Sequence, residues 1–167
     1  MKDRLPAIHN LHAEIEAASR TLAEQHADRL QCGAGCADCC IDDLTVFEVE
    51  AQTIRANYPD LLAHGQPHPP GKCAFLDDQR QCRIYDHRPY VCRTQGLPLR
   101  WLEEVEPDEW VEYRDICPLN EAGPAIEDLE PEACWELGPY ENRLAAIQAE
   151  TGNLQRIALR DLFKRSS

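Results

Sequence analysis

The cysteines are the residues of this chain with the clearest chemical potential. Nine occur among 167 residues. Four of them lie within nine positions and four more follow at wider spacing: Cys32, Cys36, Cys39 and Cys40, then Cys73, Cys82, Cys92 and Cys117. Thiolates packed this densely repel one another and bind soft cations, so the array predicts a bound metal.

The first group has the spacing of a thiolate metal site. Cys36 and Cys39 form a C-x2-C turn, which is half of a tetrahedral site. The side chain of Cys40 must diverge from that of Cys39, so it serves a second ion or another corner of a cluster. Eight thiolates would fill two four-coordinate zinc sites or hold one [4Fe–4S] cluster with ligands to spare.

The spacing Cys32-x3-Cys36-x2-Cys39 also matches that of radical S-adenosylmethionine enzymes. Those enzymes usually have an aromatic residue before the last cysteine, where this chain has Asp38. They also need a larger α/β barrel, and the segment before Cys32 has a helical pattern. We therefore expect a metal site of another class.

Composition and net charge limit the classes of partner and the cellular compartment that this chain suits. The net charge of −13 disfavours nucleic acid, whose phosphates require Lys and Arg, and leaves a basic protein partner as a hypothesis. No stretch has the length and apolarity of a membrane span, and the charged first thirty residues lack a secretory signal. We expect a cytoplasmic protein, where reducing conditions favour metal binding over disulfides.

Other candidate ligands have weaker patterns. Cys134 lies in a Pro-Glu-Ala-Cys-Trp segment without partner spacing, and we expect it to be a non-ligand. His64 and His68 precede Cys73 in a proline-rich stretch, and His87 lies between Cys82 and Cys92. These histidines are possible ligands, but a mobile loop and ordinary packing are the alternatives.

Helices are expected to flank the cysteine segments and to position them. Residues 5–30 have apolar side chains at steps of three and four, which predicts one amphipathic helix. Thr45 and Glu48 have capping-box spacing and predict a second helix that Pro59 ends. Helices are also expected over about 139–164, with Asn153 capping the last one.

The middle of the chain is less regular. Residues 64–72 predict a loop, and the segments 73–76 and 82–85 predict a short hairpin that brings Cys73 and Cys82 together. Short helices and loops are expected over 97–135. The fold class is therefore a mostly α, small helical domain with a short β-hairpin, organised around a cysteine-bound metal centre, with residues 1–167 as a single domain and 30–120 as its cysteine core.

Three segments resemble the YkgJ-type cysteine-cluster family, known by its CxxCxxCC pattern as a zinc- or iron-chelating domain. They are Cys32 to Cys40, Cys73-Ala-Phe-Leu76, and Cys82-Arg-Ile-Tyr-Asp-His-Arg-Pro-Tyr-Val-Cys92-Arg93. Cys117 matches the later cysteine that is usual in the family. The resemblance covers about residues 30–120 and implies that these eight cysteines bind metal.

The resemblance also favours a role for two arginines in offsetting the negative charge of the metal site. Four thiolates leave a zinc site or an oxidised [4Fe–4S] cluster with net negative charge, which nearby guanidinium groups would offset. Arg88 and Arg93 are the candidates, and Tyr85 is a further hydrogen-bond donor. For Arg88 the alternative is a surface ion pair with an acid such as Asp86.

Three functions follow as hypotheses. The first is a metal-binding protein that holds zinc or an iron–sulfur cluster, for metal handling or as a scaffold, with zinc preferred for protein isolated in air. The second is an iron–sulfur enzyme or enzyme component for redox or methyl-transfer chemistry, because the related flagellin lysine N-methylases carry a similar domain. The third is an acidic adaptor with a purely structural metal. Whether the protein is an enzyme stays open.

Overall fold

The structure is a computed structural model that describes residues 4–164. Helix accounts for 44% and strand for 16%, so the fold is a small α/β domain in which helix predominates. The expected excess of helix is confirmed, but the strands go beyond one short hairpin. Among residues 4–164, no helix combines the length and apolar character needed to cross a lipid bilayer.

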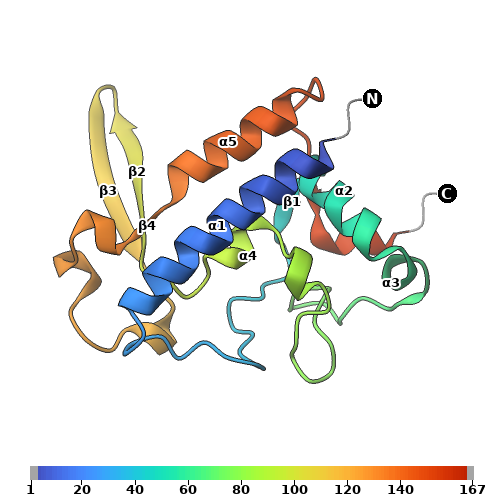
Figure 1. Ribbon diagram of the computed structural model, residues 1–167, viewed down its shortest axis with the longest axis horizontal. Helices are drawn as coiled ribbons and strands as arrows, with labels where there is room; N and C mark the ends of the chain where they lie inside the picture. The colour runs from blue at the N-terminus through green and yellow to red at the C-terminus, as the bar shows by residue number, and fades with distance from the viewer. Residues whose placement is uncertain (1–3, 165–167) are drawn as a thin grey trace. The chain divides into compact units, whose positions relative to one another are not determined.

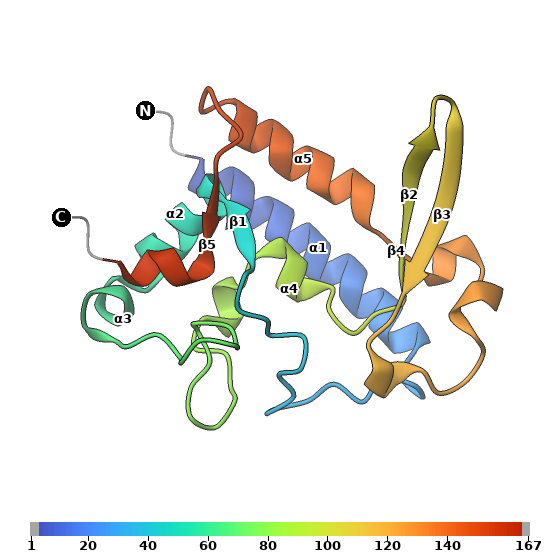
Figure 2. The ribbon, with the colours of Figure 1, turned by 180° about the vertical axis from the view of Figure 1, so that it is seen from behind.

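The elements follow one another along the chain as Figures 1 and 2 show. The helices are α1 (Leu5–Gln25), α2 (Glu48–Asn57), α3 (Pro59–His64), α4 (Tyr90–Arg93) and α5 (Leu137–Ala149). The strands are β1 (Thr45–Phe47), β2 (Leu99–Glu106), β3 (Glu109–Asp115), β4 (Trp135–Glu136) and β5 (Arg156–Ala158). Short 3₁₀ helices lie at Tyr85–His87, Pro118–Asn120, Ile126–Asp128, Pro131–Ala133 and Leu159–Phe163.

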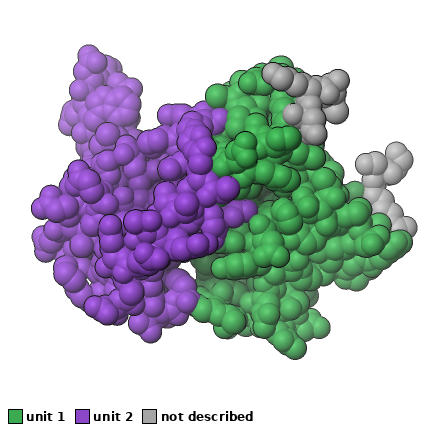
Figure 3. Space-filling view, in the orientation of Figure 1, with its two compact units in different colours: residues 1–12, 33–89, 144–167 green, residues 13–32, 90–143 purple. Residues whose placement is uncertain are grey.

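The described residues form two compact units, coloured separately in Figure 3. Unit 1 comprises residues 4–12, 33–89 and 144–164, and unit 2 comprises residues 13–32 and 90–143. Each unit is described by itself below. The single domain expected from the sequence stays a prediction.

The first predicted helix forms as α1 and buries the expected apolar face. It ends at Gln25 rather than at residue 30, so its predicted C-terminal boundary is wrong. The chain turns there because two side chains bind distant carbonyl groups. His26 Nε2 lies 2.7 Å from the carbonyl oxygen of Ala133, and Arg29 Nε donates to Ala122 at 3.0 Å.

Unit 1 is built on a small hydrophobic core beneath the β1–β5 pair. The two strands are antiparallel, with Thr45 opposite Ala158. The buried core residues are Val46, Ala51, Ile54, Phe75, Ile84, Leu159 and Leu162. Cys73 and Cys82 are partly buried against this core, which therefore sets where their sulfur atoms lie.

The predicted capping box at Thr45 is wrong, because Thr45 lies in β1 instead. Its carbonyl and hydroxyl oxygens accept hydrogen bonds from the guanidinium of Arg156 on β5, at 3.0 and 3.2 Å. Helix α2 begins three residues later, at Glu48, whose backbone N–H donates to the carbonyl of Gln155. Pairing with a distant strand thus displaces the local cap.

The last predicted helix is also wrong, although α5 confirms the helix before it. Asn153 Oδ1 accepts hydrogen bonds from the Gln155 N–H at 2.9 Å and from Gln148 Nε2 at 3.1 Å. This places Asn153 in a turn rather than at a helix N-cap. Residues 156–158 then form β5, and only a short 3₁₀ helix follows, at Leu159–Phe163.

Unit 2 contains a three-stranded sheet in the order β3–β2–β4. Strands β2 and β3 form an antiparallel hairpin that spans residues 99–115, where the sequence predicted short helices and loops. That prediction is wrong because apolar and acidic residues alternate on both faces of the hairpin, so neither face has a clear apolar pattern. Short 3₁₀ helices do occur between residues 118 and 133, as expected.

Candidate metal centre

Unit 1 carries five of the eight predicted ligands, and three of them lie in one irregular loop. The Cys36 N–H donates to Gly33 and the Cys40 N–H donates to Ala37, at 3.0 and 3.1 Å. These two successive turns fold the C-x2-C segment back on itself. The positive φ of 81° at Gly35 suits glycine and permits the first of them.

The pKa of the Cys39 thiol lies below its usual range. A hydrogen bond from the side chain of Cys40 lowers the pKa of Cys39 to about 6, and the Cys39 backbone N–H and Lys72 act in the same direction. The expectation that these two neighbouring side chains diverge is therefore wrong, because the loop turns the Cys40 thiol towards Cys39. Partial burial and the charge of Asp38 oppose this shift. Cys39 is therefore mostly thiolate at neutral pH, which is the form that binds metal.

The expected hairpin brings Cys73 and Cys82 together. Leu76 and Cys82 form an antiparallel bridge, and the Arg83 N–H donates to the Phe75 carbonyl at 2.9 Å. Burial raises the pKa of both thiols, and the charge of Cys73 raises that of Cys82 further. These two thiols are protonated at neutral pH and would release protons on binding a metal.

A backbone hydrogen bond joins this hairpin to the first cysteine loop. The Cys73 N–H donates to the carbonyl of Cys40 at 3.0 Å. Two pairs of cysteines, Cys39 with Cys40 and Cys73 with Cys82, are thereby tied into one region of unit 1. The sequence predicted the approach of Cys73 to Cys82, but it did not predict the contact between Cys39 and Cys40 or the hydrogen bond between Cys73 and Cys40.

Unit 2 contains the other three predicted ligands, and Asn120 connects their segments. Asn120 is completely buried. Its Nδ2 donates to Cys32 Sγ at 3.2 Å and to the Gly96 carbonyl at 2.8 Å, and its Oδ1 accepts the Gln31 N–H at 2.7 Å. Its own backbone N–H donates to the carbonyl of Cys117 at 2.8 Å.

Cys92 lies in α4, and Gly96 belongs to the segment that follows this helix. The contact at Gly96 therefore links that segment to Cys32 and Asn120. Gly96 has a φ of 91°, and a Cβ built on it would lie 2.6 Å from Cys32 Sγ. Only glycine therefore lets this backbone approach the sulfur. Neither Asn120 nor Gly96 was predictable from the sequence, because neither residue type is a usual metal ligand and each lies far from Cys32 in the chain.

The predicted supporting residues are placed in different surroundings. Arg88 lies over the ring of Tyr85 at 4.1 Å, and its charge also lowers the pKa of Cys82. Tyr85 is 60% exposed. Arg93 in unit 2 has a buried side chain that pairs with Glu16 at 3.0 Å. The roles of all three near a metal stay predictions.

Arg83 is a further cation at the unit 1 cysteines that sequence analysis missed. Its charge lowers the pKa of Cys73 and of Cys82, opposing the effect of burial. Its guanidinium is held in place by the carbonyl groups of Ala74 and Gln66, at 2.7 and 2.9 Å. In the sequence, the only indication of this role was the position of Arg83 directly after Cys82, in a Cys-Arg-Ile-Tyr segment.

Cys134 and the histidines have other neighbours. Cys134 is buried in unit 2, where burial raises its pKa and the charge of Arg114 opposes the rise. His87 Nδ1 lies 3.0 Å from the hydroxyl of Tyr58. The backbone of His68 accepts from Arg160 and donates to Ala74, which anchors the predicted loop. That Cys134 is a non-ligand stays a prediction.

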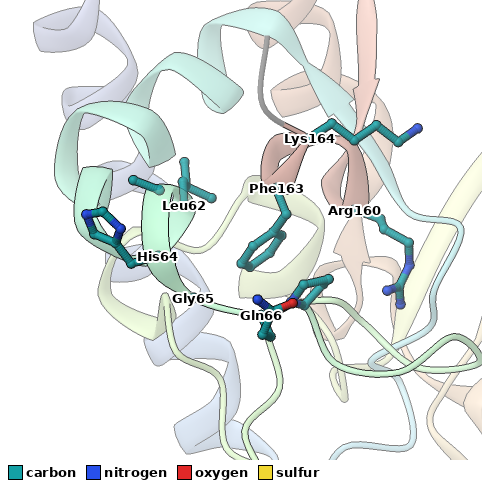
Figure 4. A pocket seen from close by; sticks show the side chains of 9 residues that line it. Leu62, His64, Gly65, Gln66, Arg160, Phe163 and Lys164 are labelled. Atoms are coloured by element: carbon teal, nitrogen blue, oxygen red, sulfur yellow. The ribbon is translucent and has the colours of Figure 1, made fainter. Parts of the chain in front are cut away.

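Unit 1 also contains a cavity of about 280 Å³. It is lined by α3, the loop that follows and the last 3₁₀ helix, and includes His64, Arg160 and Phe163. Figure 4 shows these side chains around it. No cysteine lines the cavity, and Arg160 is engaged by Asp42 and three backbone carbonyls.

The donor set fits a soft metal, but the side chains do not form a closed site as they stand. Within the described residues 4–164, no three His, Cys, Asp or Glu side chains form a group that could hold an ion. Cys36, Cys39, Cys73, Cys82, Cys117 and Cys134 are free thiols. The structure therefore brings cysteines together in pairs, and the lowered pKa of Cys39 favours its thiolate.

Asn120→Ala should make Cys32 more reactive and destabilise the protein by about 3 kcal/mol, because it leaves buried polar groups of Gln31 and Gly96 without partners. The measurements are thermal unfolding and the alkylation rate of Cys32, followed by mass spectrometry. Asn57→Ala is the control, since its amide donates to the Thr53 carbonyl within α2. Equal Cys32 alkylation in the two variants would contradict a positioning role for Asn120.

Comparison with known proteins identifies a family for this chain. A family model described as "CxxCxxCC: Putative zinc- or iron-chelating domain" matches residues 31–118. The matched segment contains all eight predicted ligands and excludes Cys134. It also agrees with the range of about 30–120 expected from the cysteine pattern. No curated protein and no solved structure matches the chain.

Proposed function

The chain belongs to the CxxCxxCC family of zinc- or iron-chelating domains, and from this premise we propose that it binds zinc or iron through its clustered cysteines. The observation that carries the proposal is the joining of two cysteine pairs in unit 1, through the hydrogen bond from Cys73 to Cys40. One of these thiols, Cys39, is already ionised near neutral pH. We favour zinc for protein isolated in air and a cytoplasmic role in metal handling or as a scaffold.

The unit 1 cysteines would hold the metal by themselves. Five thiols are more than a four-coordinate site requires: Cys36, Cys39, Cys40, Cys73 and Cys82. A bound zinc or iron ion would supply the positive charge that lets so many thiolates lie together. Cys32, Cys92 and Cys117 in unit 2 would offer three more sulfur donors, with Asn120 donating a hydrogen bond to one of them.

Two arginines support charge balance at the unit 1 site. Arg83 and Arg88 both act on Cys82, in the direction that favours its thiolate. Four thiolates around a divalent ion leave a net charge of about −2, which nearby guanidinium groups would offset. Burial against the core works the other way, so the thiolates at Cys73 and Cys82 depend on both the metal and these cations.

Metal analysis of the full chain tests the proposal. Protein purified without oxygen should carry zinc or iron, and the zinc form should be colourless. Brown protein with iron and acid-labile sulfide would instead support an iron–sulfur cluster, and with it the hypothesis of a redox or methyl-transfer enzyme. Metal-free protein that melts at the same temperature with and without added zinc or iron would contradict the proposal.

Proton release on metal binding gives a second measurement. Zinc added to metal-free protein at pH 7 in a weak buffer should release protons from Cys73 and Cys82, whose pKa values are raised. Cys39, with a pKa of about 6, should contribute little. Cys73→Ser should therefore reduce the number of protons released, whereas Cys39→Ser should weaken binding with little change in that number for each metal bound.

A further inference from the structure

The β2–β3 hairpin of unit 2 exposes an unusual share of apolar side chains. Eight large hydrophobic residues are exposed among those described, and four of them lie in this hairpin of residues 99–115. Leu102 is 53%, Val105 44%, Trp110 59% and Tyr113 39% exposed. Clustered exposed aromatic and aliphatic side chains mark an interaction surface more often than isolated ones do.

The base of the hairpin is anchored, so its exposure is not a consequence of a loose segment. Arg100 pairs with Glu112 at 3.0 Å and with Glu136 of β4 at 2.7 Å. Arg114 donates to the carbonyl groups of Ile126 and Leu129. The rings of Trp101 and Tyr113 stack across the two strands at 5.7 Å.

The same hairpin is strongly acidic. Residues 99–115 contain seven acidic residues and two basic ones, and both arginines are engaged in the ion pairs at the base. Directly opposed residues share a face, so Glu104 and Trp110 lie on one face while Glu103 and Val111 lie on the other. Both faces thus mix acidic and apolar groups.

Strand β3 is an edge of its sheet in the part of the chain that the structure describes. An edge strand offers backbone N–H and C=O groups to which another extended segment can pair. The short 3₁₀ helix at Ile126–Asp128 contacts Arg114 at the base of β3. The outer half of β3, from Glu109 to Val111, is exposed or half-exposed.

From these features we propose that the outer edge of β3 binds an extended segment of a basic protein partner. The added strand would pair with the β3 backbone and alternate Lys or Arg with β-branched or aromatic residues. Its cations would face Glu103 and Glu109 on one face of the hairpin, and its apolar side chains would cover Trp110 on the other. The inference is independent of which metal the cysteines bind.

Electrostatic repulsion argues against two other partners, a second copy of the chain and nucleic acid. A second copy of the chain would bring another acidic hairpin against this one, and like charges oppose that pairing. Nucleic acid is opposed by the same acidic side chains and by the net charge of −13.

Binding of a defined peptide to the full chain tests the proposal. The probe is a nine-residue peptide that alternates Lys or Arg with Val or Tyr, with both ends blocked. One control peptide keeps every side chain but carries N-methyl groups along one backbone edge, and the other replaces Lys and Arg by Glu. We expect the probe to bind and each control to bind at least about tenfold more weakly, which is about 1.4 kcal/mol.

Matched variants locate the site. Trp110→Ala, and separately the pair Glu103→Gln with Glu109→Gln, should weaken probe binding about tenfold without changing the melting temperature, because these side chains are exposed. The control pair Glu121→Gln with Glu132→Gln removes the same charge from exposed positions outside the hairpin.

Three results would overturn the proposal. The first is no probe binding at millimolar concentration. The second is equal binding of the N-methylated peptide, since this would show charge attraction without strand pairing. The third is self-association of the chain that Trp110→Ala abolishes, since the surface would then belong to a second copy.

Discussion

Cys39→Ser should release the bound metal and lower the melting temperature by about 10 °C or more. Serine has a harder oxygen donor and stays protonated at neutral pH, whereas the Cys39 thiol has a pKa of about 6. Metal binding at structural zinc sites contributes on the order of 10 kcal/mol to folding in small peptides. In a chain of this size each 1 kcal/mol shifts the melting temperature by roughly 2–4 °C, so even partial loss is measurable.

The measurements are metal content after purification and thermal unfolding, with and without added zinc. Cys36→Ser should act in the same direction as Cys39→Ser. Cys134→Ser is the control, because Cys134 is buried in unit 2 and lies outside the matched family segment. Full metal content and an unchanged melting temperature in Cys39→Ser would refute the ligand assignment, and loss of one metal equivalent in Cys134→Ser would show that the ninth cysteine is a ligand.

Gly96→Ala should displace the sulfur of Cys32 and cost about 2–4 kcal/mol of stability. The new Cβ would lie 2.6 Å from Cys32 Sγ and 3.2 Å from Asn120 Nδ2, so both side chains must move. The positive φ of 91° adds backbone strain of about 1–3 kcal/mol for a residue other than glycine. If Cys32 is a metal ligand, metal content should fall together with stability.

Gly152→Ala is the control for Gly96→Ala, because it introduces backbone strain without displacing a neighbouring side chain. Gly152 has a φ of 90°, almost identical to that of Gly96, and a Cβ there would meet no atom within 4 Å. It should cost backbone strain alone and leave the metal content unchanged. Unfolding, metal content and the alkylation rate of Cys32 are compared in the two variants, and equal effects on all three would mean that the Gly96 contact does not position Cys32.

Much of the candidate site was predictable because ligand chemistry and short spacing are local properties. The C-x2-C turn at Cys36 and Cys39 needs only a few backbone hydrogen bonds, and the Cys73 and Cys82 hairpin closes across a polar turn. The family pattern over residues 31–118 is likewise visible in the chain itself. Which of these cysteines bind a metal stays a prediction.

The predictions of the fold that were wrong concern segments in which contacts with distant residues outweigh the local conformational preference. Thr45 has the spacing of a helix cap, yet the hydrogen bonds from Arg156 hold it in β1. Asn153 has a capping side chain, yet it closes a turn with Gln148 and Gln155. The β2–β3 hairpin was missed because its exposed faces have no apolar stripe to mark a strand.

The sequence by itself determined the candidate metal donors, which are eight cysteines in a family pattern, and the excess of acidic charge. The tertiary structure decided which of the cysteine segments are joined. Cys40 reaches Cys73 through a backbone hydrogen bond, and buried Asn120 connects Cys32, Gly96 and Cys117 across nearly ninety residues. Spacing constrains residues within a turn or two, whereas contacts over such separations depend on core packing and on satisfying buried polar groups.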